Sequence, residues 1–129
     1  MKHLTKPRVL ICEDERFIAD LYRLEIESHG VDAEIVSNGK EALEIIKEKK
    51  FDLILLDLVM PVMDGFHVLA ELKKDKIRIP VVIVITNLSQ DINKEKCREM
   101  GAEGYIVKSD VNAADVWAKV KTFLPHFEG

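Results

Sequence analysis

Apolar residues along the chain follow two alternating periods. Strand-like runs occur at five places, and the first, third and fourth are almost continuously apolar: Arg8 to Cys12, Asp32 to Val36, Leu53 to Leu56, Val81 to Ile85 and Tyr105 to Val107. Continuous apolar runs are typical of parallel strands that are covered on both faces. Between and after these runs, apolar or mixed residues recur at helical spacing: Phe17, Ile18, Leu21 and Leu24; Ala42, Leu43, Ile45 and Ile46; Phe66, Leu69 and Leu72; Ile92, Lys96 and Met100; Ala113, Val116, Val120 and Phe123. The pattern predicts a strand followed by a helix, five times over.

Residues at the predicted boundaries agree with this count. Asn38 and Asn112 are each followed three residues later by an acidic residue, which is the pattern of a capping box at a helix N-terminus. Gly30 and Gly101 follow the first and fourth helices, where a residue that tolerates positive φ suits the C-terminal cap. Alternating strands and helices joined by short turns predict an α/β fold, with a parallel sheet, right-handed crossovers and helices on both faces.

Length and composition limit the class of protein. The chain has 129 residues, of which 47% are hydrophobic and 33% charged, and this favours a single domain, residues 1–129, with its core at about 8–124 and no output domain. No stretch approaches the roughly 20 apolar residues that span a bilayer, so we expect a cytoplasmic protein without membrane insertion. A net charge of -4 argues against direct binding to nucleic acid.

Polar residues gather at the predicted carboxyl ends of the strands. Glu13 and Asp14 follow the first strand, Asp57 the third, Thr86 the fourth and Lys108 the fifth. Each residue alone is more often structural, because Asp caps helices and Lys is usually solvated. In an open parallel sheet, however, functional groups collect beyond the carboxyl ends of strands. Their joint placement therefore predicts one site at one edge of the sheet.

Three neighbouring carboxylates repel one another unless a cation compensates them. Hard oxygen ligands without His or Cys favour Mg²⁺, which usually binds through one or two carboxylates and keeps several waters. We expect Asp14 and Asp57 to be direct ligands and Glu13 to act through water. Val59, two residues after Asp57, is the candidate for a backbone carbonyl ligand.

The same residues suit phosphoryl transfer to a carboxylate. Asp57 would be the nucleophile and would form an aspartyl phosphate, while Mg²⁺ and Lys108 would stabilise charge on the phosphoryl oxygens. The Thr86 hydroxyl would bond to the new phosphoryl group, so that this bond exists only in the modified state. Thr86 is therefore predicted to act as a sensor.

Five motifs, in order and at matching spacing, resemble the CheY-like receiver domain of two-component response regulators. They are Glu13-Asp14, Leu56-Asp57-Leu-Val-Met-Pro61, Met63-Asp-Gly65, Ile85-Thr86 and Tyr105-Ile-Val-Lys108, and the resemblance covers roughly Arg8 to Leu124. It implies a single flavodoxin-like doubly wound (βα)5 domain with strand order 2-1-3-4-5. It also implies phosphorylation of Asp57 by a sensor histidine kinase or phosphotransfer protein, with Mg²⁺ at Asp14, Asp57 and the Val59 carbonyl.

The resemblance further implies a switch and not an ordinary enzyme, with self-phosphorylation from phosphodonors and autodephosphorylation as its only chemistry. Thr86 would move toward the phosphoryl group and leave space for Tyr105. This movement would repack the face formed by the fourth helix, the fifth strand and the fifth helix, where a downstream protein binds. A homodimer formed on phosphorylation is a further partner that the family suggests.

Three residues depart from the family pattern. Glu13 stands where Asp is commoner, and it keeps the charge on a longer side chain. Asn87 follows Thr86 where a small residue is usual, which predicts an altered phosphoryl lifetime. Ser109 follows Lys108 in place of the usual Pro, and a cis bond before Ser costs about 2.5 to 4 kcal/mol.

Three other functions stay open at this point. A haloacid-dehalogenase-like phosphatase would need a second Asp at position 59, where this chain has Val. A flavin binder needs a phosphate-cradling loop after the first strand, where this chain has Glu13-Asp-Glu15. The third alternative is a receiver-like interaction module that is never phosphorylated.

Overall fold

The computed structural model describes residues 6–76 and 81–124. Within this part of the chain, strands and helices alternate, as the sequence predicts. The strands are β1 (Arg8–Cys12), β2 (Asp32–Val36), β3 (Leu53–Leu56), β4 (Val82–Thr86) and β5 (Gly104–Val107). The helices are α1 (Arg16–Glu27), α2 (Gly39–Glu48), α3 (Gly65–Lys74), α4 (Asp91–Glu99) and α5 (Ala113–Phe123). The predicted tail from residue 125 onward lies outside the described residues.

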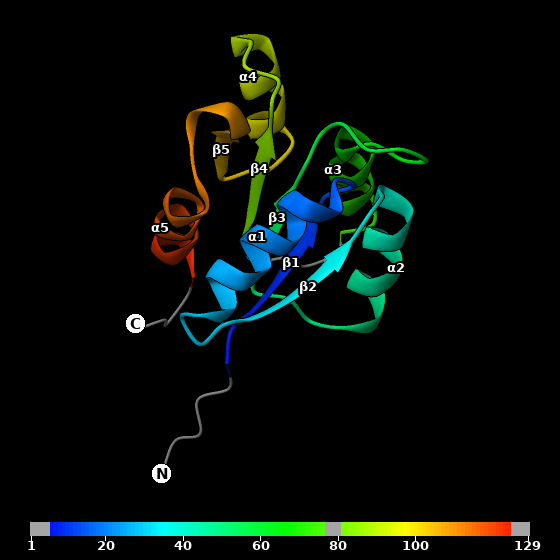
Figure 1. Ribbon diagram of the computed structural model, residues 1–129. Helices are drawn as coiled ribbons and strands as arrows, with labels where there is room; N and C mark the ends of the chain where they lie inside the picture. The colour runs from blue at the N-terminus through cyan, green and yellow to red at the C-terminus, as the bar shows by residue number, and fades with distance from the viewer. Residues whose placement is uncertain (1–5, 77–80, 125–129) are drawn as a thin grey trace.

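The strands form one parallel sheet in the order β2-β1-β3-β4-β5, which confirms the flavodoxin-like doubly wound fold (Figure 1). The register pairs Cys12 with Leu56 and Leu56 with Val84, so β1 and β3 end level with each other and β4 continues two residues further, to Thr86. Every residue of β3 and β4 is buried, as expected from their continuous apolar runs. The sheet therefore presents one edge from which several strand ends project.

Two apolar clusters cover the two faces of the sheet. α1 and α5 pack on one face, where Ala19, Ile26 and Val120 are buried. α2 and α3 pack on the other face together with Cys97 of α4, and α4 lies at the top of the view (Figure 1). On the first face, His29 stacks on Trp117 of α5 with ring centroids 4.3 Å apart. Both faces of the central strands β3 and β4 are thus closed to solvent, while the edge strands β2 and β5 are partly exposed.

The helix predicted near Phe17 forms, but it buries other residues than the predicted stripe. Ala19, Tyr22 and Ile26 point into the core, whereas the exposed fractions are 65% for Phe17, 46% for Leu21 and 61% for Leu24. The helix carries apolar residues on more than one face, and periodicity alone cannot say which face meets the sheet. In α4 likewise, Ile92 is exposed and Cys97 is the buried residue.

The predicted caps form with one difference. Asn112 and Asp115 make a full capping box at α5. Asn38 accepts a hydrogen bond from the Glu41 amide at 2.9 Å, but the Glu41 carboxylate accepts from Ser37 and not from the Asn38 backbone. Gly30 and Gly101 adopt positive φ values of 82° and 104°. In the described part of the chain, no helix has the length and apolar character needed to cross a membrane.

Candidate functional site

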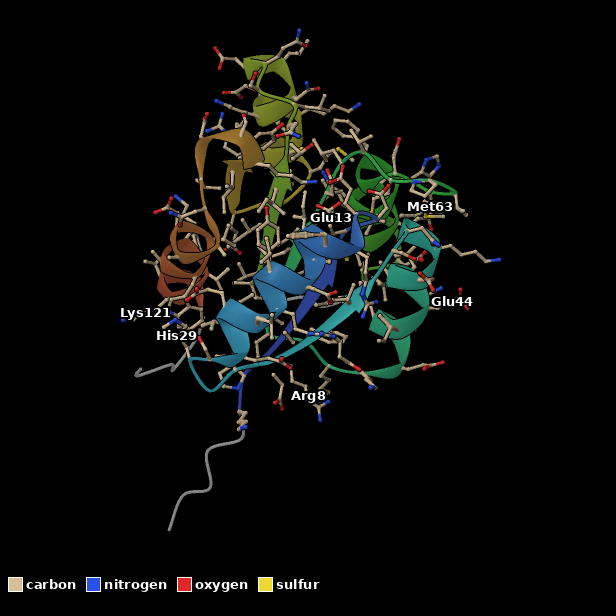
Figure 2. The ribbon with its side chains drawn as sticks, in the orientation of Figure 1. Arg8, Glu13, His29, Glu44, Met63 and Lys121 are labelled. Atoms are coloured by element: carbon tan, nitrogen blue, oxygen red, sulfur yellow. The ribbon has the colours of Figure 1, made fainter. Side chains whose placement is uncertain are left out.

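Residues that follow β1 and β3 meet at the carboxyl edge of the sheet. Figure 2 labels Glu13 at this edge and Arg8 at the opposite end of β1. The Asp57 amide donates to the Cys12 carbonyl at 3.1 Å, and the Glu13 amide donates to the Val36 carbonyl at 3.0 Å. These backbone bonds continue the sheet by one residue. They fix the starting points of the acidic side chains before the chain turns away.

The three predicted acids lie together. Glu13, Asp14 and Asp57 each place a carboxylate oxygen within 4.8 Å of the others. Glu13 and Asp57 are 1% and 3% exposed, while Asp14 is exposed. The group is therefore a buried acidic pair with one solvent-facing acid beside it, and that acid marks the side from which an ion or substrate would enter.

Lys108 reaches the same place from the end of β5. Its ammonium lies 2.7 Å from Asp57 Oδ2 and also contacts Glu13 Oε1. Its side chain is only 10% exposed, so solvent screens these contacts weakly. Three carboxylates and one ammonium leave two negative charges without compensation. One divalent cation would balance them.

Burial and charge act against each other in this group. Burial lowers the pKa of the Lys108 ammonium, but hydrogen bonds to Asp57 and Glu13 outweigh it, and the net pKa is raised above the ordinary value. Burial raises the pKa of the Glu13 carboxyl, against the opposing effect of its bonds to Lys108 and to the Glu15 amide. Lys108 is therefore firmly cationic at neutral pH, as a role in stabilising phosphoryl oxygens requires.

The loop after Asp57 is held close to the acid. Asp57 Oδ1 accepts a hydrogen bond from the Val59 amide at 3.2 Å, and Val59 itself is exposed. Asp64 caps α3 by accepting from the His67 amide at 2.9 Å. A Cβ at Gly65 would lie 2.3 Å from the Asp57 carbonyl oxygen, so only glycine lets α3 start this near the site.

Thr86 and Tyr105 meet at Leu88. Thr86 is fully buried at the end of β4, and its Oγ1 accepts from the Leu88 amide at 3.5 Å. The half-buried Tyr105 donates from its hydroxyl to the Leu88 carbonyl at 2.6 Å. Leu88 had no role in the sequence prediction, because a backbone partner leaves no signal in residue identity. The two predicted switch residues thus share one contact in the loop between β4 and α4.

The departures from the family pattern have plain structural outcomes. The described residues contain no cis peptide bond, so the Lys108-Ser109 bond is trans, and a 3-10 turn, Lys108–Asp110, begins at the lysine. Asn87 is exposed immediately after the buried Thr86. Glu13 reaches Lys108, a contact that the sequence prediction did not include.

Sequence reasoning also missed the exposed stripe on α1. Phe17, Leu21 and Leu24 lie at spacings of four and three residues, which places them on one side of the helix. The available signal was the excess of apolar residues in α1 over what one face of a helix can bury. The stripe begins three residues after Asp14, so its first residue, Phe17, lies close along the chain to the acidic group.

The donor set fits a hard divalent cation. It consists of carboxylate oxygens, with no imidazole or thiolate in the acidic group, and it carries an excess of two negative charges. Mg²⁺ prefers such ligands and tolerates an open side filled by water. With a nucleophilic carboxylate and a fixed ammonium beside it, the arrangement is suited to forming and stabilising an acyl phosphate.

Comparison with known proteins agrees with this geometry. The family model described as the response regulator receiver domain matches residues 9–121. Among curated proteins, the chain is similar to the alkaline phosphatase synthesis transcriptional regulatory protein PhoP of Bacillus subtilis, with 32% identity over 121 residues. That match covers 94% of this chain and 50% of the relative, so the chain spans about half the length of that protein.

Solved structures with the same fold include two receiver domains. The Francisella response regulator 1452 receiver domain has 30% identity and a TM-score of 0.85, and the match covers 92% of this chain and 97% of that one. A CheY-like response regulator receiver domain protein from Methanospirillum hungatei has 30% identity and a TM-score of 0.84, with coverage of 93% and 94%. The similarity thus extends over almost the whole of the described fold.

Proposed function

The chain belongs to the family of response regulator receiver domains, and on this premise we propose that it is a phosphorylation-dependent switch with Asp57 as phosphoacceptor. Receiver domains are signalling switches and not enzymes in the ordinary sense. The observation that carries the proposal is the buried Asp57 carboxylate, bonded to Lys108 at 2.7 Å and grouped with Glu13 and Asp14. A structural ion pair would not need two further carboxylates at the same place.

The chemical step is a displacement at phosphorus. A carboxylate oxygen of Asp57 forms a bond to phosphorus, and the bond from phosphorus to the donor breaks. The electron pair of that bond leaves with the donor, which is a histidine imidazole of a kinase or phosphotransfer protein, or the acetate of acetyl phosphate, and the donor takes up any proton from solvent. Lys108 donates to a phosphoryl oxygen and so neutralises charge where it develops.

Mg²⁺ is the cofactor that fits these residues. Asp14, Asp57 and the Val59 carbonyl would hold it, and Glu13 would act through water. When bound, the ion supplies positive charge to the phosphoryl oxygens and relieves repulsion among the carboxylates. The chain itself contributes the fixed positions of the acids, set by the ends of β1 and β3.

Thr86 and Tyr105 are the proposed switch residues. A phosphoryl group on Asp57 would accept a hydrogen bond from the Thr86 hydroxyl. This charge-assisted bond would be stronger than the long bond, 3.5 Å, that Thr86 Oγ1 accepts from the Leu88 amide. Because Tyr105 holds the Leu88 carbonyl, a movement of Thr86 reaches Tyr105 through the same loop. A groove of about 490 Å³ between α4 and β5, bordered by Tyr105, lies on the α4-β5-α5 face where the downstream partner would bind.

The exposed stripe of α1 is the proposed contact for the phosphodonor protein. Phe17, Leu21 and Leu24 present apolar surface beside the acidic group. A helix of a histidine kinase or phosphotransfer protein that packs on this stripe would carry its histidine to Asp57. We propose that this phosphoryl transfer takes place in the cytoplasm, where receiver domains meet such kinases.

The test is phosphorylation by a small donor. Incubation with Mg²⁺ and acetyl phosphate, followed by intact mass measurement, is expected to add one phosphoryl group. The addition should be absent in Asp57→Ala, strongly reduced when EDTA replaces Mg²⁺, and retained in Asp110→Asn, which removes an exposed acid of the Lys108–Asp110 turn. Unmodified protein under all conditions would favour the alternative of an interaction module that is never phosphorylated.

A further inference from the structure

Glu13 makes a closed set of contacts in the interior. Its Oε1 contacts the Lys108 ammonium, and its Oε2 accepts from the Glu15 amide at 3.1 Å. The glutamate is 1% exposed and the lysine side chain 10%. Both carboxylate oxygens therefore contact groups of this chain, and the contact with Lys108 is buried.

The contact depends on the length of the side chain. The Glu13 backbone is fixed by its bond to the Val36 carbonyl, and the lysine ammonium is fixed by Asp57 at 2.7 Å. An aspartate at position 13 lacks one carbon–carbon bond of about 1.5 Å and would withdraw its carboxylate from the ammonium. A glutamine keeps the length and an acceptor oxygen but loses the charge.

We propose, resting on the phosphoacceptor role of Asp57, that Glu13 is a positioning residue that holds the Lys108 ammonium at the phosphoryl site. In the unmodified chain two carboxylates hold the ammonium, Asp57 and Glu13. When an Asp57 oxygen bonds to phosphorus, Lys108 exchanges this partner for a phosphoryl oxygen. The Glu13 contact does not take part in the exchange, so it keeps the ammonium in place throughout.

This role differs from that of an acid that only orders water on Mg²⁺. An acid that only orders water acts through its charge, so Glu13→Asp should preserve the Mg²⁺ affinity. Once Mg²⁺ is saturating, both Glu13→Asp and Glu13→Gln should then react as fast as wild type. A positioning residue depends on reach. At saturating Mg²⁺, we expect Glu13→Asp to be about tenfold slower with acetyl phosphate, and Glu13→Gln to stay within about threefold of wild type.

Two measurements accompany the rates. Isothermal calorimetry of Mg²⁺ binding should give Glu13→Asp an affinity within about twofold of wild type, so that its slower reaction is not a metal effect. Binding of beryllofluoride, a phosphoryl mimic observed by ¹⁹F NMR at saturating Mg²⁺, should weaken about tenfold in Glu13→Asp and much less in Glu13→Gln. Glu15→Gln, which alters an exposed acid two residues away, is the matched control and should equal wild type in each measurement.

The outcomes separate the two proposals. Wild type that gains no phosphoryl group contradicts the proposed function itself. Wild type that is phosphorylated, with Glu13→Asp equally fast at saturating Mg²⁺, contradicts the positioning role alone. If circular dichroism shows that Glu13→Asp does not fold, Glu13→Gln and Glu13→Met provide the comparison. Both side chains are as long as that of glutamate, but only that of Gln has an oxygen that can accept a hydrogen bond from Lys108. Equal rates in these two variants would then refute the proposal.

Discussion

The Tyr105 hydroxyl and the Leu88 carbonyl oxygen lie 2.6 Å apart, which joins β5 to the loop that leaves β4. The amide of the same Leu88 faces Thr86 Oγ1 at 3.5 Å. One loop residue therefore contacts the candidate sensor through its N–H and the candidate aromatic switch through its C=O. The buried Thr86 and the half-buried Tyr105 are therefore connected through two hydrogen bonds and the backbone of Leu88, and the strength of the Tyr105 bond decides how tightly the two residues are linked.

Removing the Tyr105 hydroxyl should loosen this loop. In Tyr105→Phe the Leu88 carbonyl loses its donor, and we expect the free energy of unfolding to fall by about 1 kcal/mol. Urea denaturation measures that loss, and hydrogen exchange should show faster exchange for amides of the loop between Thr86 and Asp91. Tyr22→Phe, in α1 on the other face of the sheet, is the control for losing a tyrosine hydroxyl. Loop exchange that is unchanged in Tyr105→Phe would contradict the link.

The alternation of parallel strands and helices was predictable because its determinants are local, whereas the strand order 2-1-3-4-5 was implied by the family resemblance and not by periodicity. Continuous apolar runs such as Leu53–Leu56 are typical of strands buried on both faces, and helical segments between them favour parallel crossovers. Once the strands are parallel, the residues that follow them must share an edge. The grouping of Asp57 with Lys108, 51 residues later, thus follows from strand order and not from any local signal.

Features that depend on side-chain direction were less predictable. The sequence of α1 offers Phe17 with Leu21 and Leu24 as one stripe and Ala19 with Tyr22 and Ile26 as another. Packing against β2 and α5 selects the second stripe, and this choice is tertiary. The Glu13 contact with Lys108 likewise depends on the reach of two long side chains from the ends of β1 and β5, which β3 and β4 separate in the sheet, and residue identities do not specify that reach.

The α1 stripe should matter for protein donors and not for small ones. Leu21→Ser removes apolar area from an exposed position, so the stability should change by no more than about 0.5 kcal/mol. The protein donor is chosen from a panel of autophosphorylated histidine kinases as the one that phosphorylates wild type fastest. With this kinase we expect phosphotransfer to Leu21→Ser to be about tenfold slower than to wild type, whereas the rate with acetyl phosphate should be unchanged. Ile92→Ser, at an exposed apolar position of α4, is the matched control. Equal slowing with both donors would point to damage at Asp57 and not to lost docking.

Asn87 should influence how long the phosphoryl group persists. Its exposed amide side chain follows Thr86 directly, and we expect it to hinder water that approaches a phosphoryl group on Asp57. Asn87→Ala is expected to shorten the lifetime about threefold, equivalent to about 0.7 kcal/mol in the barrier. The measurement is loss of the acyl phosphate after removal of the donor, followed by intact mass. Identical rates in wild type and Asn87→Ala would refute the idea.

Mg²⁺ should stabilise the folded chain by relieving repulsion in the acidic group. At 100 times its dissociation constant, a ligand that binds only the native state adds about 2.7 kcal/mol to the free energy of unfolding. Urea denaturation with Mg²⁺ or with EDTA should show this increment in wild type and in Asp91→Asn, which alters an exposed acid of α4, and a much smaller one in Asp14→Asn. The same increment in Asp14→Asn would mean that the ion binds elsewhere.

The N-terminal cap of α2 should make stability fall in acid. Glu41 Oε1 accepts hydrogen bonds from the Ser37 amide and hydroxyl at 3.0 and 2.7 Å, and these bonds lower the pKa of the carboxyl below its ordinary value of 4.5. Because the pKa of Glu41 is lower in the native chain than in the unfolded chain, the unfolded chain binds more protons at pH values between these two pKa values. The contribution of Glu41 is therefore complete above pH 4.5 and is lost as the pH falls through the native pKa.

The difference in unfolding free energy between wild type and Glu41→Gln isolates this contribution from those of other carboxylates. We expect urea denaturation to give a positive difference above pH 4.5 that shrinks steadily toward pH 3 as the Glu41 carboxyl takes up its proton. Its size will be modest because the carboxylate is exposed and solvent screens it. Glu44→Gln, in the same helix but beyond its first turn, controls for the loss of one negative charge (Figure 2). A wild-type advantage that stays constant from pH 6 to pH 3 would show that the cap acts through packing and not through the ionised carboxylate.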